Sequence, residues 1–113
     1  MAFAREALRN IFKKPVTEKY PFERREPAEG FRGRPVWDMK KCIGCGTCVR
    51  VCPVKAVEMI GRGKEAIIKH HLERCIYCGQ CAESCPTRAI TMTPEYELSD
   101  TDKSRMLHVY ERK

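Results

Sequence analysis

The chain has 113 residues, 42% of them hydrophobic, with eight cysteines and a formal net charge of +7. A chain of this length holds one small domain, and such a domain depends on metals or partners more than on a large apolar core. No apolar run is long enough to span a bilayer, and residues 1–14 lack the uninterrupted apolar stretch of a signal peptide. A nucleic-acid function would need a basic stripe on a recognisable module, and none is present. We therefore expect a cytoplasmic protein whose thiols stay reduced.

Residues 2–14 are predicted to form an amphipathic helix. Apolar side chains recur at helical spacing on one face, at Ala4, Ala7, Leu8, Ile11 and Phe12. Basic side chains surround that face, at Arg5, Arg9, Lys13 and Lys14. Pro15 ends the helix because the residue before a proline is disfavoured in the helical region. Such a helix lies on a membrane surface or packs on a partner subunit. The alternative is that it folds back on its own domain.

Residues 16–38 show little periodicity and are interrupted by prolines and glycines, which predicts an extended arm. A structureless segment of this length is unusual inside a compact protein. We therefore expect residues 1–38, the helix and the arm together, to dock on a neighbouring subunit. Disorder is the alternative for an isolated chain.

Two copies of one cysteine run follow the arm. Each reads C-x2-C-x2-C-x3-C-P, from Cys42 to Pro53 and from Cys75 to Pro86, and together they hold every cysteine of the chain. This is the run that binds iron–sulfur clusters in bacterial-type two-cluster ferredoxins. Three cysteines on a tight loop wrap one cluster, while the fourth lies on a helical turn that points away and ligates the other cluster. The proline after it stops the turn from continuing.

We therefore predict two [4Fe–4S] clusters with crossed ligands. The ligands of the first cluster are Cys42, Cys45, Cys48 and Cys85. The ligands of the second cluster are Cys75, Cys78, Cys81 and Cys52. Zinc sites usually take two CxxC pairs, and a disulfide framework would need an oxidising compartment, so both readings are weaker. With all eight thiols used and no catalytic pair in the sequence, the predicted chemistry is one-electron transfer.

The two runs belong to an internal repeat. A shift of about 33 residues superimposes all four cysteines and many flanking residues, such as Ala56 on Ala89 and Met59 on Met92. Each half is predicted to hold a cluster loop, a helical turn and a strand, packed around a pseudo-twofold axis. Predicted strands cover residues 57–60, 65–69 and 90–93, with a turn at 61–64. The fold class is α+β: a bacterial two-[4Fe–4S] ferredoxin fold over residues 39–93 with an N-terminal helix and arm.

Residues 94–113 are predicted to form a docking tail. A capping pattern from Ser99 to Asp102 suggests a short helix near residues 100–107. The apolar side chains Met106, Leu107, Val109 and Tyr110 would be exposed on so small a domain. They serve either to dock on a partner or to cover the domain's own core.

The residues around the cysteines should tune the clusters. Gly46 and Gly79 let backbone N–H groups approach the sulfides closely. Apolar side chains should exclude water, at Ile43, Val54, Val57 and Ile76. Basic side chains supply positive charge, at Lys40, Lys41, Arg50, Lys55, Arg74 and Arg88. Tyr77 stands where the first half has Gly44, and we expect it to pack near its cluster. The three histidines lack ligand-like spacing and are predicted to be ordinary strand or tail residues.

The segments before and after the cysteine runs indicate a narrower family than two-cluster ferredoxins in general. The arm segments 14–21 and 31–34, with the tail segments 94–98 and 104–107, resemble the two-cluster ferredoxin-like subunit of respiratory complex I and of energy-converting membrane-bound [NiFe] hydrogenases. This resemblance implies an N-terminal helix at the membrane surface, an arm wrapped on neighbours and clusters that pass electrons to a small hydrogenase-like subunit. The chain is shorter than most complex I members, which favours the hydrogenase-type complexes and soluble ferredoxin as the donor.

The predicted function is therefore electron transfer by a subunit that is not an enzyme on its own. Its expected partners are hydrogenase-like small and large subunits and a membrane-arm subunit. Its expected location is the cytoplasmic face of the membrane, held peripherally. A complex I-type quinone or sulfur reductase is the alternative. A free ferredoxin, or a module of a soluble oxidoreductase, fits less well because free carriers of this family tend to be acidic and lack a long arm.

Overall fold

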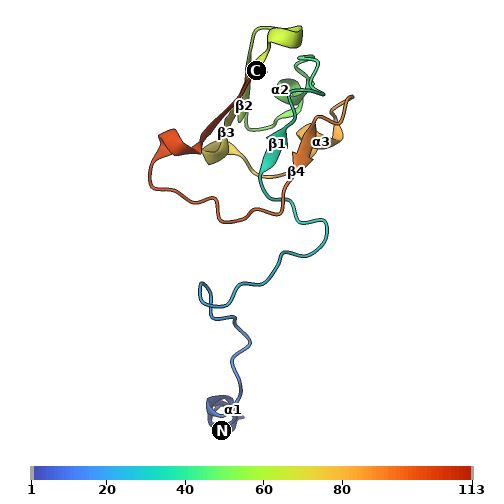
Figure 1. Cartoon of the computed structure of the whole chain (residues 1–113). Coiled ribbons are helices and arrows are strands. Elements are labelled where there is room, and N and C mark those ends of the chain that lie inside the picture. Colours follow the sequence, from blue (N-terminus) through green and yellow to red (C-terminus); the bar gives the residue numbers. More distant parts are fainter. Residues whose placement is uncertain (1, 113) are drawn as a thin grey trace.

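The computed structural model describes residues 2–112 and is elongated, with extents of 68 × 29 × 23 Å. A domain of short strands and helices lies at one end, and helix α1 (Ala2–Ile11) lies at the other (Figure 1). The arm connects them. The α+β class predicted from the sequence is confirmed.

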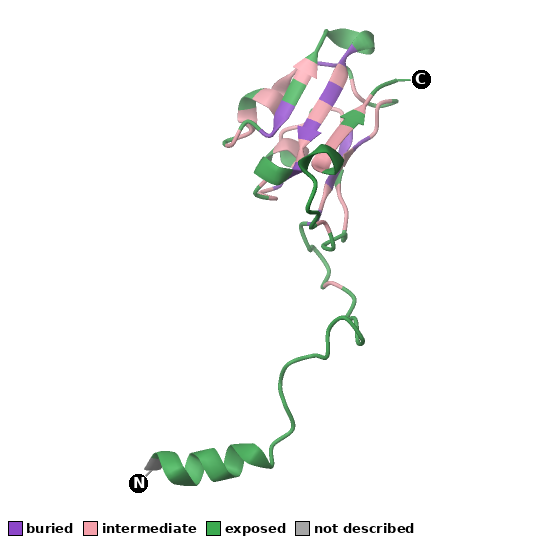
Figure 2. Ribbon diagram, turned by 90° about the vertical axis from the view of Figure 1, so that its left-hand side faces the viewer, coloured by how far each residue is buried: buried purple, intermediate pink, exposed green. Residues whose placement is uncertain are grey.

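Helix α1 ends three residues earlier than predicted, where Lys13 N–H donates to Asn10 O in a closing turn. Residues 3–26 are all exposed (Figure 2), including the large apolar side chains Phe3, Leu8 and Phe12. The helix therefore does not fold back on the domain. Within residues 2–112, no helix combines the length and the apolar character that a membrane crossing requires.

The strands form two antiparallel sheets. In the first, β1 (Pro35–Trp37) pairs with β4 (Ile90–Met92). In the second, β3 (Ile67–His71) lies between β2 (Val57–Ile60) and β5 (Leu107–Tyr110). The predicted strand at 57–60 matches β2, and β4 is one residue shorter than predicted. The strand predicted from residue 65 begins at Ile67, because a 3-10 turn occupies Gly63–Glu65.

Each sheet combines strands from both halves of the repeat. Trp37 is the register partner of Ile90, and 33 residues later His70 is the partner of Val57. The bonds at the strand ends repeat in the same way: Asp38 N–H donates to Ala89 O and His71 N–H donates to Ala56 O, both at 2.7 Å. Each half therefore completes the sheet of the other, which is the arrangement that a pseudo-twofold axis between them requires.

The core lies where the two sheets meet. Its buried apolar cluster is made of Trp37, Val57, Ile68 and Ile90. His70 is fully buried beside it, with its ring centroid 5.0 Å from that of Trp37. These two residues are separated by one repeat length, so the aromatic pair joins equivalent positions of the two halves.

The tail covers this core. Its helical turn is a 3-10 helix, Lys103–Met106, shorter than predicted and capped by the Asp102 carboxylate, which accepts from Ser104 N–H at 3.0 Å. Strand β5 follows, and the Tyr110 ring lies 5.2 Å from the ring of Trp37. Of the two roles considered for these apolar residues, the structure shows the fold-back onto the core. Val109 alone among them stays half exposed.

The arm is bound along its second half. Strand β1 lies inside the segment predicted as arm, because Pro35–Trp37 completes the sheet that β4 alone cannot form. Before it, Gly33 N–H donates to Thr93 O at 2.9 Å, and Arg34 forms an ion pair with Glu95 at 2.8 Å. Farther out, Tyr20 O–H donates to Glu97 at 2.6 Å. Residues 93–97 therefore run beside the arm, and the tail then returns to the domain in β5.

Candidate iron–sulfur sites

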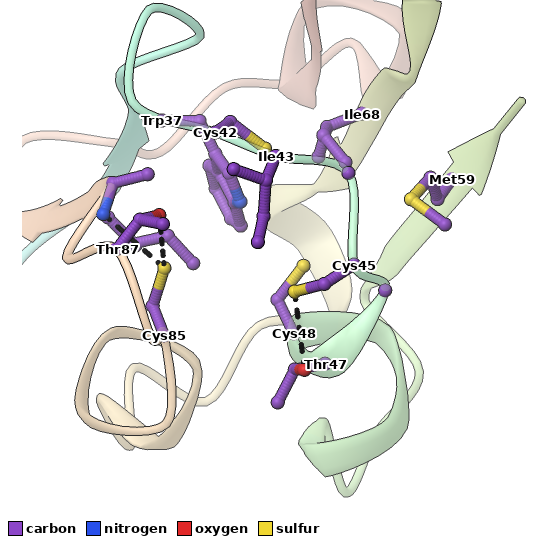
Figure 3. Close-up of a pocket in the computed structure, with 14 residues that line it drawn as sticks. Trp37, Cys42, Ile43, Cys45, Thr47, Cys48, Met59, Ile68, Cys85 and Thr87 are labelled. Carbon is purple, nitrogen blue, oxygen red and sulfur yellow. Dashed lines mark hydrogen bonds between the residues drawn. The ribbon is translucent and has the colours of Figure 1, made fainter. Parts of the chain in front are cut away.

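A first cavity opens between the two cysteine runs and is lined by Cys42, Cys45, Cys48 and Cys85. Figure 3 shows Cys85, which comes from the second run, on the opposite side of the hollow from Cys45 and Cys48. The remaining wall is largely apolar and includes Trp37, Ile43, Met59, Ile68 and Ile90. The four cysteines that the sequence assigns to one cluster thus share one cavity.

A second cavity is lined by Cys52, Cys75, Cys78 and Cys81. Its other lining residues include Pro35, Val54, Ile76, Tyr77 and Met92. Here the first run supplies the single cysteine and the second run supplies three. The crossed grouping predicted from the spacing coincides with the lining of the two cavities, and Ile43, Val54 and Ile76 lie where they were expected.

Left-handed backbone positions shape both cysteine loops. Gly46 and Gly79 each have φ 75° and immediately precede α2 (Thr47–Val51) and α3 (Gln80–Glu83). A residue without a Cβ adopts this conformation without strain, so the loop can curl back and begin a helix. The helices then carry the third cysteine of each run inward. This explains the glycine at this point of both runs.

The fourth cysteine of each run is held by a backbone hydrogen bond. Ala56 N–H donates to the Cys52 thiol at 3.2 Å, and Ala89 N–H donates to the Cys85 thiol at 3.3 Å. The turn between donor and acceptor contains a left-handed residue in both halves, Lys55 at φ 50° and Arg88 at φ 49°. Such bonds stabilise a thiolate and favour the reduced state of a cluster bound to it.

Burial and hydrogen bonding push the thiol pKa values in opposite directions. Burial raises the pKa of Cys81 to about 11 and also raises the pKa values of Cys48 and Cys75. The hydroxyl of Thr47, 3.3 Å from the Cys45 sulfur, lowers the pKa of Cys45. Burial also acts on Cys85, but the hydrogen bonds from Ala89 and Thr87 outweigh it and leave that pKa below its ordinary value. Cluster assembly must therefore displace protons from the buried thiols.

The donor set fits a polynuclear cluster. Within residues 2–112 no three His, Cys, Asp or Glu side chains converge on one point. The thiols of each set instead stand around the wall of a cavity, as they must when each thiolate binds a different iron atom at a corner of one cluster. The residues present therefore suit two [4Fe–4S] clusters, which would give the chain its capacity to accept and donate single electrons.

Two arginines beside the sites were not predicted from the sequence. Arg32 donates to the carbonyl oxygen of Cys78 at 2.6 Å, and Arg112 donates to that of Cys42 at 2.8 Å. The arginines come from the arm and the tail, far from the cysteines in sequence. Among the predicted basic residues, Lys41 pairs with Asp38 at 3.8 Å and Arg74 with Glu73 at 3.9 Å. No local motif would have revealed Arg32 or Arg112.

The fold and the paired cavities define a two-cluster iron–sulfur protein. Residues 41–105 match the family model described as "4Fe-4S dicluster domain". Because this match covers more than half of the chain, the chain belongs to that family. Two [4Fe–4S] clusters, as predicted, are its cofactors.

Similar proteins come from plastids, cyanobacteria and archaea. The chain is 43% identical over 99 residues to "NAD(P)H-quinone oxidoreductase subunit I, chloroplastic" of Angiopteris evecta, covering 81% of this chain and 55% of that protein. It is 48% identical over 101 residues to subunit I of Picosynechococcus sp., covering 83% and 50%. A solved chain from "the membrane-bound sulfane sulfur reductase (MBS), an archaeal respiratory membrane complex" matches with TM-score 0.69 and 38% identity, over 85% of this chain and 53% of that one. The chain therefore spans about half the length of these relatives.

Proposed function

We propose that this chain is an electron-transfer subunit of a membrane-associated, complex I-related oxidoreductase. The observation that carries the proposal is the pair of four-cysteine cavities within one small domain. Two clusters so close together provide a relay, because electrons can enter at one and leave at the other. The chain offers no second chemistry to a substrate, so it serves as a subunit and the enzyme is the assembled complex.

The ligand sets follow the two cavities. We assign Cys42, Cys45, Cys48 and Cys85 to cluster 1 and Cys75, Cys78, Cys81 and Cys52 to cluster 2. Two observations support this: the fourth cysteine faces the cavity of the other run, and its sulfur is oriented by a backbone N–H four residues later.

For the parent complex we favour a complex I-type quinone or sulfur reductase over a hydrogenase. The sequence-based preference for a hydrogenase depended on the length of the chain. The relatives reported above instead carry the names of a quinone oxidoreductase and a sulfane sulfur reductase. The likeness of this two-cluster chain to both supports the role we propose for it, the delivery of electrons to the subunit that reduces the acceptor.

Because Arg32, Gly33 and strand β1 bind the domain, the assembly element predicted over residues 1–38 is narrowed in this proposal to residues 1–31. Among residues 3–31 the large apolar side chains lie exposed, with Phe3 and Phe12 each 89% accessible, and basic residues flank them on α1. Such a surface stays out of water by packing on another subunit or on the membrane surface. Through it the chain would hold a peripheral place in the complex, beside the acceptor subunit, with soluble ferredoxin as the proposed donor.

The test is to purify a tagged chain from detergent-solubilised membranes of the native host. We expect several other subunits to co-purify and the complex to reduce either a quinone or a sulfur compound. The two acceptors, assayed separately with reduced ferredoxin as donor, distinguish the quinone reductase from the sulfur reductase. Recovery of the chain alone from the soluble fraction, with rapid exchange of electrons with free partners, would show that it is a diffusing ferredoxin.

A further inference from the structure

The arm and the tail each place one arginine on the loop of one cluster. Arg32 lies against the second loop, where its Nη1 donates to Cys78 O at 2.6 Å. Arg112 lies against the first loop, where its Nη2 donates to Cys42 O at 2.8 Å. Both carbonyls belong to proposed cluster ligands, one in each set. Each cluster therefore has one guanidinium fixed to its own binding loop.

Further contacts hold each arginine in place on its loop. Cδ, Nε and Cζ of Arg32 lie 3.5–3.7 Å from the place where a Cβ on Gly79 would be, so the arginine packs against the glycine of the loop. Arg112 makes two further bonds to Met39 O, from Nε at 3.0 Å and from Nη2 at 2.6 Å, so that two of its three nitrogens hold it on the loop. A guanidinium presents its donors in a rigid plane and stays charged at all relevant pH values.

We propose that Arg32 and Arg112 set the reduction potentials of the two clusters separately, Arg32 for cluster 2 and Arg112 for cluster 1. Reduction adds one electron, and thus one negative charge, to a cluster that its thiolates already make anionic. A fixed positive charge nearby stabilises the reduced state more than the oxidised state. The proposal depends on the ligand assignment above and not on the identity of the parent complex.

Glu83 makes the effect adjustable at one of the two sites. Its carboxylate lies 3.4 Å from Arg32 Nη2, so it partly neutralises the charge that Arg32 brings to cluster 2. Removal of the carboxylate charge should strengthen the influence of Arg32. Removing the positive charge of Arg32 should therefore lower the potential of cluster 2, and removing the negative charge of Glu83 should raise it.

The test is a redox titration of the full chain with both clusters loaded, with dithionite as the one-electron donor. Electron paramagnetic resonance gives the reduced fraction, and the hyperfine-shifted cysteine signals in NMR spectra show which cluster changes. Arg32→Gln should lower the reduction equilibrium constant of cluster 2 roughly three- to ten-fold, and Arg112→Gln that of cluster 1 by a similar factor. Glu83→Gln should raise the constant for cluster 2.

Two further variants separate the effect of the charge of Arg32 from the effects of its shape and of the arm's total charge. Arg32→Lys keeps the charge without the flat fork and should retain most of the potential of cluster 2. Arg25→Gln removes an equal charge from the arm at a residue that pairs with Glu18, and should leave both potentials unchanged. Equal shifts at both clusters, or a shift with Arg25→Gln as large as that with Arg32→Gln, would overturn the proposal.

The iron content shows whether a variant still holds both clusters. The identity of the cluster whose potential shifts tests the ligand assignment. If Arg112→Gln does not hold both clusters, Glu83→Gln and Arg32→Lys still test the charge effect at cluster 2. Full loading with unmoved potentials contradicts the role of the arginines. A shift confined to the cluster opposite to the one predicted contradicts the ligand assignment instead.

Discussion

Residues 35–60 and 68–93 repeat the same backbone turns and the same cysteines but differ at several other side chains. Equivalent glycines share φ 75°, and the left-handed residues Lys55 and Arg88 differ by one degree. Where the two halves pack against each other, however, the first half has Trp37 and the second has His70 at the equivalent position. On the loops, Gly44 is matched by Tyr77, and both have positive φ, 65° and 55°.

The polar surroundings of the two sets of thiols also differ. The hydroxyls of Thr47 and Thr87 lie 3.3 and 3.6 Å from the sulfurs of Cys45 and Cys85, both in the first cavity. One repeat length away from these threonines stand Gln80 and Val54. Because hydrogen bonds to thiolates favour the reduced state, the first cluster should have the higher potential. The comparison teaches that the backbone sets the number and placement of clusters, while side chains make them unequal.

The largest effect should come from breaking the crossed pairing. Cys52→Ala should remove the cluster held by the second run and leave the other largely intact, while Cys85→Ala should do the reverse. Each variant should then retain about half of the iron and acid-labile sulfide, as one remaining [4Fe–4S] cluster requires. Mössbauer spectra of the two variants would identify the surviving cluster. Loss of the first cluster in Cys52→Ala would show that the ligands are not crossed.

Two truncations should separate the arm from the domain. Deletion of residues 2–31 should leave both clusters in place but release the chain from its complex. Deletion of residues 2–38 also removes β1 and the buried Trp37, which should cost at least about 3–5 kcal/mol and prevent stable cluster binding. Visible absorption and co-purification with membranes measure the two results. Full membrane recovery of the shorter deletion would contradict an assembly role for the arm.

Mirrored substitutions should reveal the difference between the two loops. A Cβ on Gly44 would collide with the backbone of Gly63, so Gly44→Ala should destabilise the first loop by about 2–3 kcal/mol. Tyr77→Gly relieves a left-handed tyrosine and should cost little, since a gain of about 1 kcal/mol offsets the lost packing. The denaturant midpoint for loss of the visible absorption gives both values. Equal losses would mean that the loops tolerate change alike.

The smallest effect concerns His70 and pH. Burial lowers the pKa of His70 to about 4, and the positive charges of His108, His71 and Arg34 lower it a little further, while the Glu73 carboxylate opposes the shift. The unfolded chain binds this proton near the ordinary value of 6.5, so stability is full above that pH. It falls as the pH drops toward 4 and then levels off, by up to about 2 kcal/mol once the anionic clusters are considered.

His70→Leu should remove this dependence, because leucine carries no titratable group. The substitution also breaks no hydrogen bond of the described residues, since neither ring nitrogen of His70 has a partner. The measurement is unfolding by denaturant at pH values between 5 and 7.5, with His71→Leu as the matched control. The neighbouring His71 is hydrogen-bonded to Glu73 at 3.1 Å and only partly buried. If the slope with pH persists in His70→Leu, another group carries it.

The sequence was sufficient for the parts that repeat. The doubled run and the 33-residue shift located both sites, and strand β2 agreed with its alternating pattern. Strand β1 was not predicted, because three residues that begin with a proline are too few to show the alternation of a strand. Extension of the repeat toward the N-terminus would have found it, since the shift places Pro35 on Ile68 and Trp37 on His70.

Contacts without a local pattern could not be predicted. Strand β5 follows a polar segment, and its apolar residues fit docking on a partner as well as packing on the domain. Its place depends on the free edge of β3, which only the folded sheet reveals. The arginine contacts with Cys42 and Cys78 depend in the same way on where the arm and the tail come to lie.

The exchange of strands between the halves has a consequence for the history of the chain. Neither half alone completes its own sheet, because each pairs a strand with the other half. With the proposed crossed ligands, each half would also lend one cysteine to the cluster of the other. The domain is in effect a symmetric dimer of a half-length unit, joined by the short connection between β2 and β3. An ancestor that encoded one unit could have bound both clusters as a homodimer. Fusion of two copies into one gene would then free each copy to change its side chains without the other.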